Sequence, residues 1–187
     1  MKTPVELLAL ARAQPGRITY ASAGAGGISH MATELLASAA RLKLVHVPYK
    51  GGSQAVTDLI GGHVDLYMGS IPQVIAHVRA LKLNAIAVTS RLRSSVAPQV
   101  PTLSDIAPGY ELELWWGVFA PAGVPRSVLT ALNGEINKLL ATPKMKAFLA
   151  SEAAVPAAVS PGEFADFVSN EIEHWRKVAR DAPIRLD

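Results

Sequence analysis

Apolar and polar residues follow two different periods along the first half of the chain. Residues 18–21 form a short run of strand-forming residues, which predicts a buried β-strand. From Ile28, apolar residues recur at i, i+3, i+4, i+7 and i+8, the spacing of one helix face. The same two patterns repeat downstream, with predicted strands at residues 44–47, 64–68 and 85–88 and predicted helices at residues 54–60 and 70–79. Because strands and helices alternate with short connections, we expect an α/β fold with a mainly parallel sheet and helices on both faces.

The pattern changes after Ser90, where the chain becomes polar and proline-bearing. One helical turn is predicted at residues 102–106, and residues 112–119 predict a strand that contains two adjacent tryptophans. Beyond this strand the spacing is helical, with predicted helices at residues 125–140, 143–150 and 161–180. We therefore expect residues 114–187 to be mostly helical.

Three glycine-containing loops, at residues 22–27, 48–52 and 69–70, follow three of the predicted strands. Parallel strands end at the same edge of a sheet, so these loops are expected to cluster there. Ligands of open α/β sheets bind at this carboxyl edge. Each loop also offers a hydroxyl or an amine, and this coincidence predicts a ligand-binding site.

The first loop, Ser22–Gly27, lies directly before a predicted helix. Glycines let a backbone approach a ligand closely, and the free N–H groups at a helix start favour an anion. The side chains of Ser22, Ser29 and His30 add possible donors, and Lys50 adds positive charge in the second loop. The candidate site comprises Ser22, Ala23, Gly24, Ala25, Gly26, Gly27, Ser29, His30, Tyr49, Lys50, Gly51 and Ser70. Two plainer alternatives remain: the glycines only make a tight turn, and Lys50 is only an exposed lysine.

Composition bounds the class of protein. The chain has 187 residues, half of them hydrophobic, so it can bury a substantial core in one domain or two small ones. Its charge of +3 comes from scattered basic residues, which argues against nucleic-acid binding. It has no cysteine, which excludes disulfides and thiolate metal sites. No window is apolar enough to span a bilayer, and residues 1–4 lead into a predicted helix rather than a signal peptide.

Motifs for catalysis and nucleotide binding are absent. The first loop departs from the dinucleotide pattern, because Ser29 stands at the third glycine position and Val47-Pro48 ends the second strand without an acidic residue. Adjacent residues on a helix, such as Ser29 and His30, cannot face each other as nucleophile and base. The other histidines lack metal-ligand spacing. We expect no catalytic residues, no metal and no cofactor.

Five motifs, taken together and in this order, resemble one known family. They are Tyr20–Gly24 with Ser29-His30, His46–Gly52, Ala87–Ser90, Val100–Thr102 and Trp116–Gly123. The chain thereby resembles the substrate-binding proteins of tripartite tricarboxylate transporters, the Bug family, from about residue 3 to residue 180.

The resemblance implies a two-lobed fold like that of type II periplasmic binding proteins. Residues 3–113 resemble one nearly complete α/β lobe, and residues 114–187 resemble the helical C-terminal part of the other lobe, without its N-terminal half. The resemblance further implies a periplasmic protein that captures a small carboxylate for a membrane permease and performs no chemistry. The family often has an acidic residue where this chain has Gly69-Ser70, a departure that bears on amine-bearing ligands.

Two expectations concern alternatives and assembly. A different class of protein, a small α/β enzyme, could use the same anion pocket for a phosphorylated or acyl substrate. The helices of residues 125–180 carry strongly apolar faces with few strands to cover. Leaving such side chains in water is costly, so we expect a homodimer to cover them, or a fold-back onto the sheet of residues 18–90.

Overall fold

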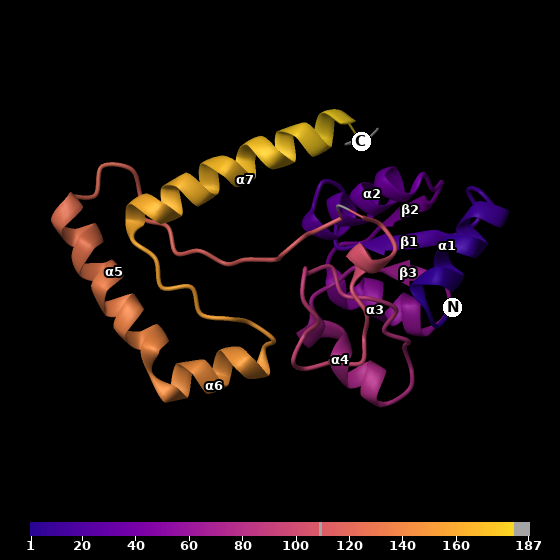
Figure 1. Cartoon of the computed structure of the whole chain (residues 1–187), viewed down its shortest axis with the longest axis horizontal. Coiled ribbons are helices and arrows are strands. Elements are labelled where there is room, and N and C mark those ends of the chain that lie inside the picture. The colour runs from indigo at the N-terminus through magenta and orange to yellow at the C-terminus, as the bar shows by residue number, and fades with distance from the viewer. Residues whose placement is uncertain (109, 182–187) are drawn as a thin grey trace. The chain divides into compact units, whose positions relative to one another are not determined.

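The structure is a computed structural model that describes residues 1–108 and 110–181. The chain forms two compact units, one of Met1–Glu113 with the chain end from Val178, and one of Leu114–Lys177. The elements in chain order are α1 (Pro4–Ala13), β1 (Thr19–Ser22), α2 (Ile28–Ala40), β2 (Val45–Pro48), α3 (Gly52–Ile60), β3 (Leu66–Tyr67), α4 (Ile71–Arg79), η1 (Leu103–Asp105), α5 (Arg126–Ala141), α6 (Pro143–Ser151) and α7 (Pro161–Asp181) (Figure 1).

Unit 1, the unit of Met1–Glu113, is built around a parallel sheet in the order β2-β1-β3. The central strand β1 pairs Tyr20 with His46 of β2 and with Leu66 of β3. Tyr20 and the following Ala21 are completely buried, as expected for a strand covered on both faces. The predicted parallel α/β arrangement is therefore confirmed, with strand ends that differ by one or two residues.

The two faces of β1 pack against different helices, because successive side chains of a strand point to opposite faces. Ala21 contributes to a buried cluster with Ala55 of α3 and Val64. Tyr20 faces the other way and donates a hydrogen bond to Glu34 of α2. Figure 1 shows α2 and α3 on either side of the strands, so helices cover both faces as predicted.

The predicted fourth strand at residues 85–88 is wrong. Only Val88 forms a β-bridge, and its partner is Thr102. The N–H of Val88 donates to the carbonyl of Pro101 and its carbonyl accepts from Leu103, at 2.8 Å each. The apolar run therefore pairs with the following loop instead of extending the sheet. The helical turn predicted at residues 102–106 is confirmed as η1.

Unit 2, the unit of Leu114–Lys177, consists of α5, α6, most of α7 and an extended segment before them. The extended segment contradicts the predicted strand at residues 112–119, because it has no strand partner among the described residues. Trp115 instead packs edge-on against Phe164 and Phe167 of α7, and its Nε1–H donates to Glu171 at 2.9 Å.

The helices of unit 2 confirm the periodicity, yet their apolar faces are only partly covered. No residue of α5 or α6 is fully buried, and Leu132 and Leu139 are each about half exposed. Exposed apolar side chains also line the extended segment, where Trp116 is 69% and Phe119 65% exposed. Across the described residues, no helix has the length and apolar character needed to cross a membrane.

Candidate functional site

The glycine loop, residues 22–27, joins the central strand β1 to the N-terminus of α2. The helix after β1 leads to β2 on one side, and β3 lies on the other side of β1. This is the point of an open α/β sheet at which connections diverge and ligands bind. The second loop lies against the first, since the N–H of Tyr49 donates to the carbonyl of Ser22 at 3.0 Å.

Buried side chains accept hydrogen bonds from backbone N–H groups of the glycine loop, on its side toward the protein interior. The hydroxyl of Ser29 accepts from the N–H of Ala23 at 2.9 Å, and Nδ1 of His30 accepts from the N–H of Gly26 at 3.0 Å. The hydroxyl of Ser22 accepts from Gly24 at 3.3 Å. These three side chains are at most 5% exposed, so their role in the structure is to fix the loop.

Two features leave the solvent-facing side of the glycine loop open. Ala25, Gly26 and Gly27 are exposed, and Gly27 is the N-cap of α2, so no side chain caps the helix. The N–H groups of the first helical turn therefore point toward the loop, where the helix dipole favours negative charge. Gly26 has φ +73°, a left-handed conformation that glycine adopts without strain.

A stack of aromatic rings lies beneath this loop. The imidazoles of His30 and His46 lie face to face, with centroids 3.9 Å apart and planes within 8°. The ring of Tyr20 lies next to both imidazoles, with its centroid 4.9 Å from that of His46 and 6.2 Å from that of His30. Nε2 of His46 is 2.7 Å from the hydroxyl of Ser22. The stack thus connects the buried strand to the side chain that anchors Gly26.

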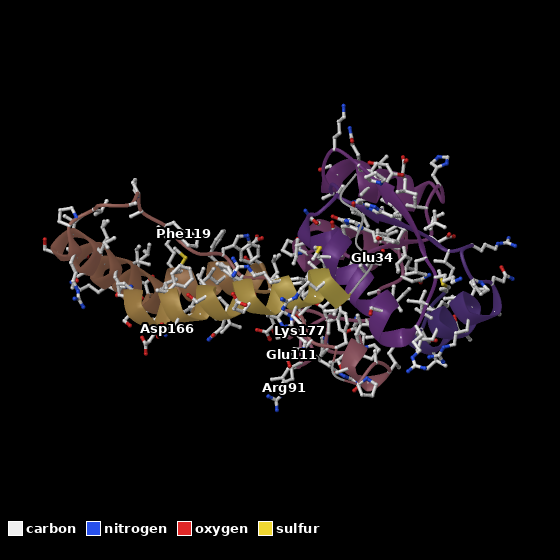
Figure 2. All side chains as sticks on the ribbon, turned by 90° about the horizontal axis from the view of Figure 1, so that it is seen from above. Glu34, Arg91, Glu111, Phe119, Asp166 and Lys177 are labelled. Carbon is white, nitrogen blue, oxygen red and sulfur yellow. The ribbon has the colours of Figure 1, made fainter. Side chains whose placement is uncertain are left out.

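Burial and neighbouring charges shift the protonation of this stack. Burial lowers the pKa of His46, and the adjacent His30 lowers it further, while the carboxylate of Glu34 opposes both effects. Burial, followed by the hydrogen bond to Glu34, raises the pKa of Tyr20 well above its usual value. Glu34, labelled in Figure 2, lies on α2 one turn after His30. Both shifts favour a neutral phenol and a neutral imidazole in the stack.

The second loop places its charged and aromatic side chains apart from each other. Lys50 is exposed, and its backbone N–H donates to Gln54 at 3.2 Å. The hydroxyl of Tyr49 donates to Asp58 of α3 at 2.7 Å, which raises the pKa of Tyr49. Only the backbone of Tyr49 therefore borders the glycine loop, and Gly51 follows as the N-cap of α3.

The third loop, Gly69-Ser70, follows β3 at the same edge. Ser70 is the N-cap of α4 and half-buried, but its hydroxyl makes no capping hydrogen bond. A Cβ at Gly69 would lie 2.2 Å from the ring of Tyr67, so any other residue there would require this ring to move. The hydroxyl of Tyr67 in turn donates to Gln73 at 3.2 Å. The hydroxyl of Ser70 is therefore not used to cap α4.

Sequence reasoning missed three members of the site, namely Tyr20, Glu34 and His46. Tyr20 and His46 were named only as the first residues of two family motifs, and Glu34 was not named. Their signals were nevertheless present: Tyr20 and Ser22 share a strand face, and His30 and Glu34 are four residues apart on one helix. Among the residues that the structure describes, no three histidine or carboxylate side chains gather to hold a metal ion.

The fold and the loops at the carboxyl edge are those of an α/β ligand-binding domain. Residues 1–183 match the family described as "Tripartite tricarboxylate transporter family receptor" (TctC), and the chain belongs to this family. The predicted family is therefore confirmed. The family consists of substrate-binding transport receptors rather than enzymes, and the enzymatic alternative is not favoured.

Two curated relatives illustrate the match. The chain is 42% identical over 175 residues to the UPF0065 protein in the tcbD-tcbE intergenic region of Pseudomonas sp. (strain P51). This alignment covers 92% of this chain and 52% of that protein. It is 32% identical to Protein BugT of Bordetella pertussis, over 96% of this chain and 56% of that protein. The chain thus spans about half the length of these relatives.

Solved structures agree on the fold. The R. palustris protein Rpa4515 with adipate is 30% identical, with a TM-score of 0.91 over 98% of this chain and 62% of that chain. MatC from Rhodopseudomonas palustris with bound malate is 28% identical, with a TM-score of 0.82 over 95% of this chain and 62% of that chain. The periplasmic-binding-protein fold class is therefore confirmed.

Proposed function

We propose that this chain is the ligand-binding part of a periplasmic solute-binding protein that captures a small carboxylate and delivers it to a membrane permease. The observation that carries the proposal is the glycine loop, with its uncapped helix N-terminus at the carboxyl edge of the sheet. Membership of the transporter receptor family supports the same conclusion.

In this proposal a ligand carboxylate lies above residues 25–27 and accepts hydrogen bonds from the N–H groups of the first turn of α2. A helix N-terminus stabilises such an anion by about 0.3–1 kcal/mol when exposed and up to ~2 when partly buried. Lys50 adds an exposed positive charge, and the hydroxyl of Ser70, which makes no capping hydrogen bond, adds a donor or acceptor. Ser22, Ser29 and His30 contribute by fixing the loop, as their buried hydrogen bonds indicate.

The ligand class follows from the chemistry of the loop and from the neighbours. Backbone N–H groups and one lysine recognise a carboxylate without selecting the rest of the molecule. The neighbours with adipate and with malate hold dicarboxylic acids, which makes dicarboxylates the first ligands to test. We extend to this chain the periplasmic location and the permease partner of its family.

The test is a titration of the ¹⁵N-labelled full chain with adipate and with malate, followed by amide chemical shifts. We expect shifts centred on residues 25–30. Ala25→Asp places a negative charge on the exposed loop and should weaken binding about tenfold, or ~1.4 kcal/mol. Ala25→Asn is the matched control, because it has the same size without the charge and should bind like the wild type.

Two outcomes contradict the proposal. If neither acid shifts the amides of the glycine loop, the chain does not bind dicarboxylates there. If Ala25→Asp and Ala25→Asn bind equally well, the ligand carboxylate lies away from the loop. Binding of sugar phosphates in place of carboxylates would favour the enzymatic alternative.

A further inference from the structure

One side chain fixes the middle of the glycine loop, and its hydrogen bond requires a particular protonation state. Nδ1 of His30 accepts the N–H of Gly26 at 3.0 Å. A histidine nitrogen accepts a hydrogen bond only when it carries no proton, so His30 must be neutral with its proton on Nε2. A protonated His30 would present a second N–H to the N–H of Gly26, and this bond would be lost.

The groups around His30 determine how it responds to protonation. They are His46 of β2, stacked on it at 3.9 Å, Tyr20 and Ser22 of β1, and Glu34 of α2. Glu34 is the carboxylate in this set, and it accepts from the hydroxyl of Tyr20. His30 itself is 3% exposed.

Protonation affects the hydrogen bonds of the two imidazoles differently. Nε2 of His46 meets a hydroxyl, which can donate to a neutral ring or accept from a protonated one, so the bond to Ser22 survives either way. Nδ1 of His30 meets an N–H, which can only donate. Because the rings are face to face, one proton on the pair also opposes a second.

We propose that His30 is a positioning residue that holds the glycine loop in its binding conformation, and that protonation of the His30–His46 pair releases the loop. The affinity for a carboxylate therefore falls in acidic solution for two reasons: the loop leaves its binding conformation, and the ligand itself becomes protonated. This inference rests on the proposed function for its binding consequence, but the release of Gly26 takes place without any ligand.

The first experiment therefore uses the wild-type chain without ligand. The imidazole C–H signals of His30 and His46 and the amide of Gly26 are followed by NMR between pH 8 and pH 5, together with amide hydrogen exchange. We expect the Gly26 amide to shift and to exchange faster in step with protonation of the pair. The N–H of Gly16, another exposed glycine of positive φ, bonds to the carbonyl of Lys43 and serves as an internal control.

The second experiment compares variants that do or do not titrate. Asparagine carries its Oδ1 at nearly the position of Nδ1, so His30→Asn should keep an acceptor for Gly26 that no proton can block. His30→Leu removes the acceptor. With adipate as probe, we expect His30→Leu to bind about tenfold more weakly than the wild type at pH 8, and His30→Asn to bind within about twofold of it.

On acidification to pH 5, wild-type affinity should fall about tenfold more than that of His30→Asn. Protonation of adipate affects both proteins equally, so the ratio of the two affinities isolates the protein's contribution. His46→Gln, which keeps a polar atom toward Ser22, should retain the Gly26 response to pH.

A Gly26 amide that stays unchanged while the imidazoles titrate, or that stays unchanged down to pH 5, overturns the inference. Equal pH profiles for wild type and His30→Asn overturn it as well. If Gly26 responds as expected but adipate does not bind at any pH, the positioning role of His30 stands and the proposed function fails.

Discussion

Unit 1 and unit 2 have similar shares of apolar residues but bury them very differently. In unit 1, Tyr20, Leu36 and Tyr110 are at most 1% exposed, and Tyr110 donates its hydroxyl to the carbonyl of Ala32 at 3.1 Å. In unit 2, all of whose residues the structure describes, no residue is fully buried. Helical periodicity is equally clear in both, so periodicity alone does not produce a core.

The difference is the sheet. A helix with one apolar face needs a second surface to cover it, and in unit 1 the strands provide that surface for α2 and α3. Unit 2 has helices and an extended segment but no strand pairs. Its aromatic contacts, such as Trp115 with Phe167, replace only part of that coverage.

The distribution of fluorophores makes this comparison measurable. All four tyrosines lie in unit 1, and all three tryptophans lie in unit 2. Tyrosine fluorescence therefore reports mainly on unit 1, and tryptophan fluorescence reports on unit 2.

The largest expected effect is a difference between two leucine substitutions. Leu36→Ala removes a side chain that is 1% exposed and should lower the free energy of unfolding by about 2–5 kcal/mol. Leu132→Ala removes one that is 51% exposed and should cost under ~1 kcal/mol. Urea unfolding, followed by both fluorophores, measures both values. A cost of several kcal/mol for Leu132→Ala would mean that something covers unit 2 in solution.

The next effect concerns association. Trp116 and Phe119, the latter labelled in Figure 2, are exposed on the extended segment of unit 2, and burying each in an interface would contribute about 1.5–3 kcal/mol. The sequence predicts that a second copy covers the apolar helix faces of residues 125–180. If that copy also covers the extended segment, light scattering should detect a dimer in the wild type and a monomer in the Trp116→Ser, Phe119→Ser variant.

Leu92→Ser is the matched control for association, because Leu92 is 77% exposed but belongs to unit 1. This variant should associate like the wild type. A wild-type chain that remains monomeric at every concentration would contradict the dimer and favour the fold-back alternative.

The smallest effect is the response of stability to pH. The pKa of His46 is lower in the folded chain than the ordinary histidine value, so folding favours its neutral form. This contribution is complete above the ordinary pKa of about 6.5 and is lost as the pH falls below it toward the lowered value. We expect the tyrosine-monitored transition to occur at a lower temperature at pH 5 than at pH 7.

His46→Gln should make the thermal transition of unit 1 less dependent on pH. The tryptophan signal is the internal reference, and it should show less dependence than the tyrosine signal if the effect is local to unit 1. An unchanged pH profile in His46→Gln would assign the response to other groups.

The sequence was sufficient where a local pattern determines the outcome. Periodicity located α2 from Ile28 and α7 from Pro161, and the order of strands and glycine loops was sufficient for the parallel sheet and its carboxyl edge. These features depend on residues close together in the chain. The family resemblance added the fold class, which periodicity could not supply.

The sequence was insufficient where the pairing of a strand or the orientation of a side chain depends on residues distant in the chain. Residues 85–88 have strand-like composition, but Val88 pairs with Thr102 rather than with the sheet. The spacing of Ser29 and His30 indicated donors beside a ligand, whereas the structure turns both inward, to Ala23 and Gly26. A sequence pattern identifies a polar side chain near a loop, but not the side of the loop on which it lies.

The hydrogen bonds beneath the glycine loop also have a consequence for the kinetics of capture. Fixing the backbone of one residue costs about 1–2 kcal/mol of conformational entropy. The hydrogen bonds that Ser29 and His30 accept from Ala23 and Gly26 make the protein incur this cost when it folds, before any ligand arrives. Under the proposed function, a ligand that meets the loop needs no prior rearrangement of it, and its rate of association should be governed by diffusion and by attraction to the positive helix end.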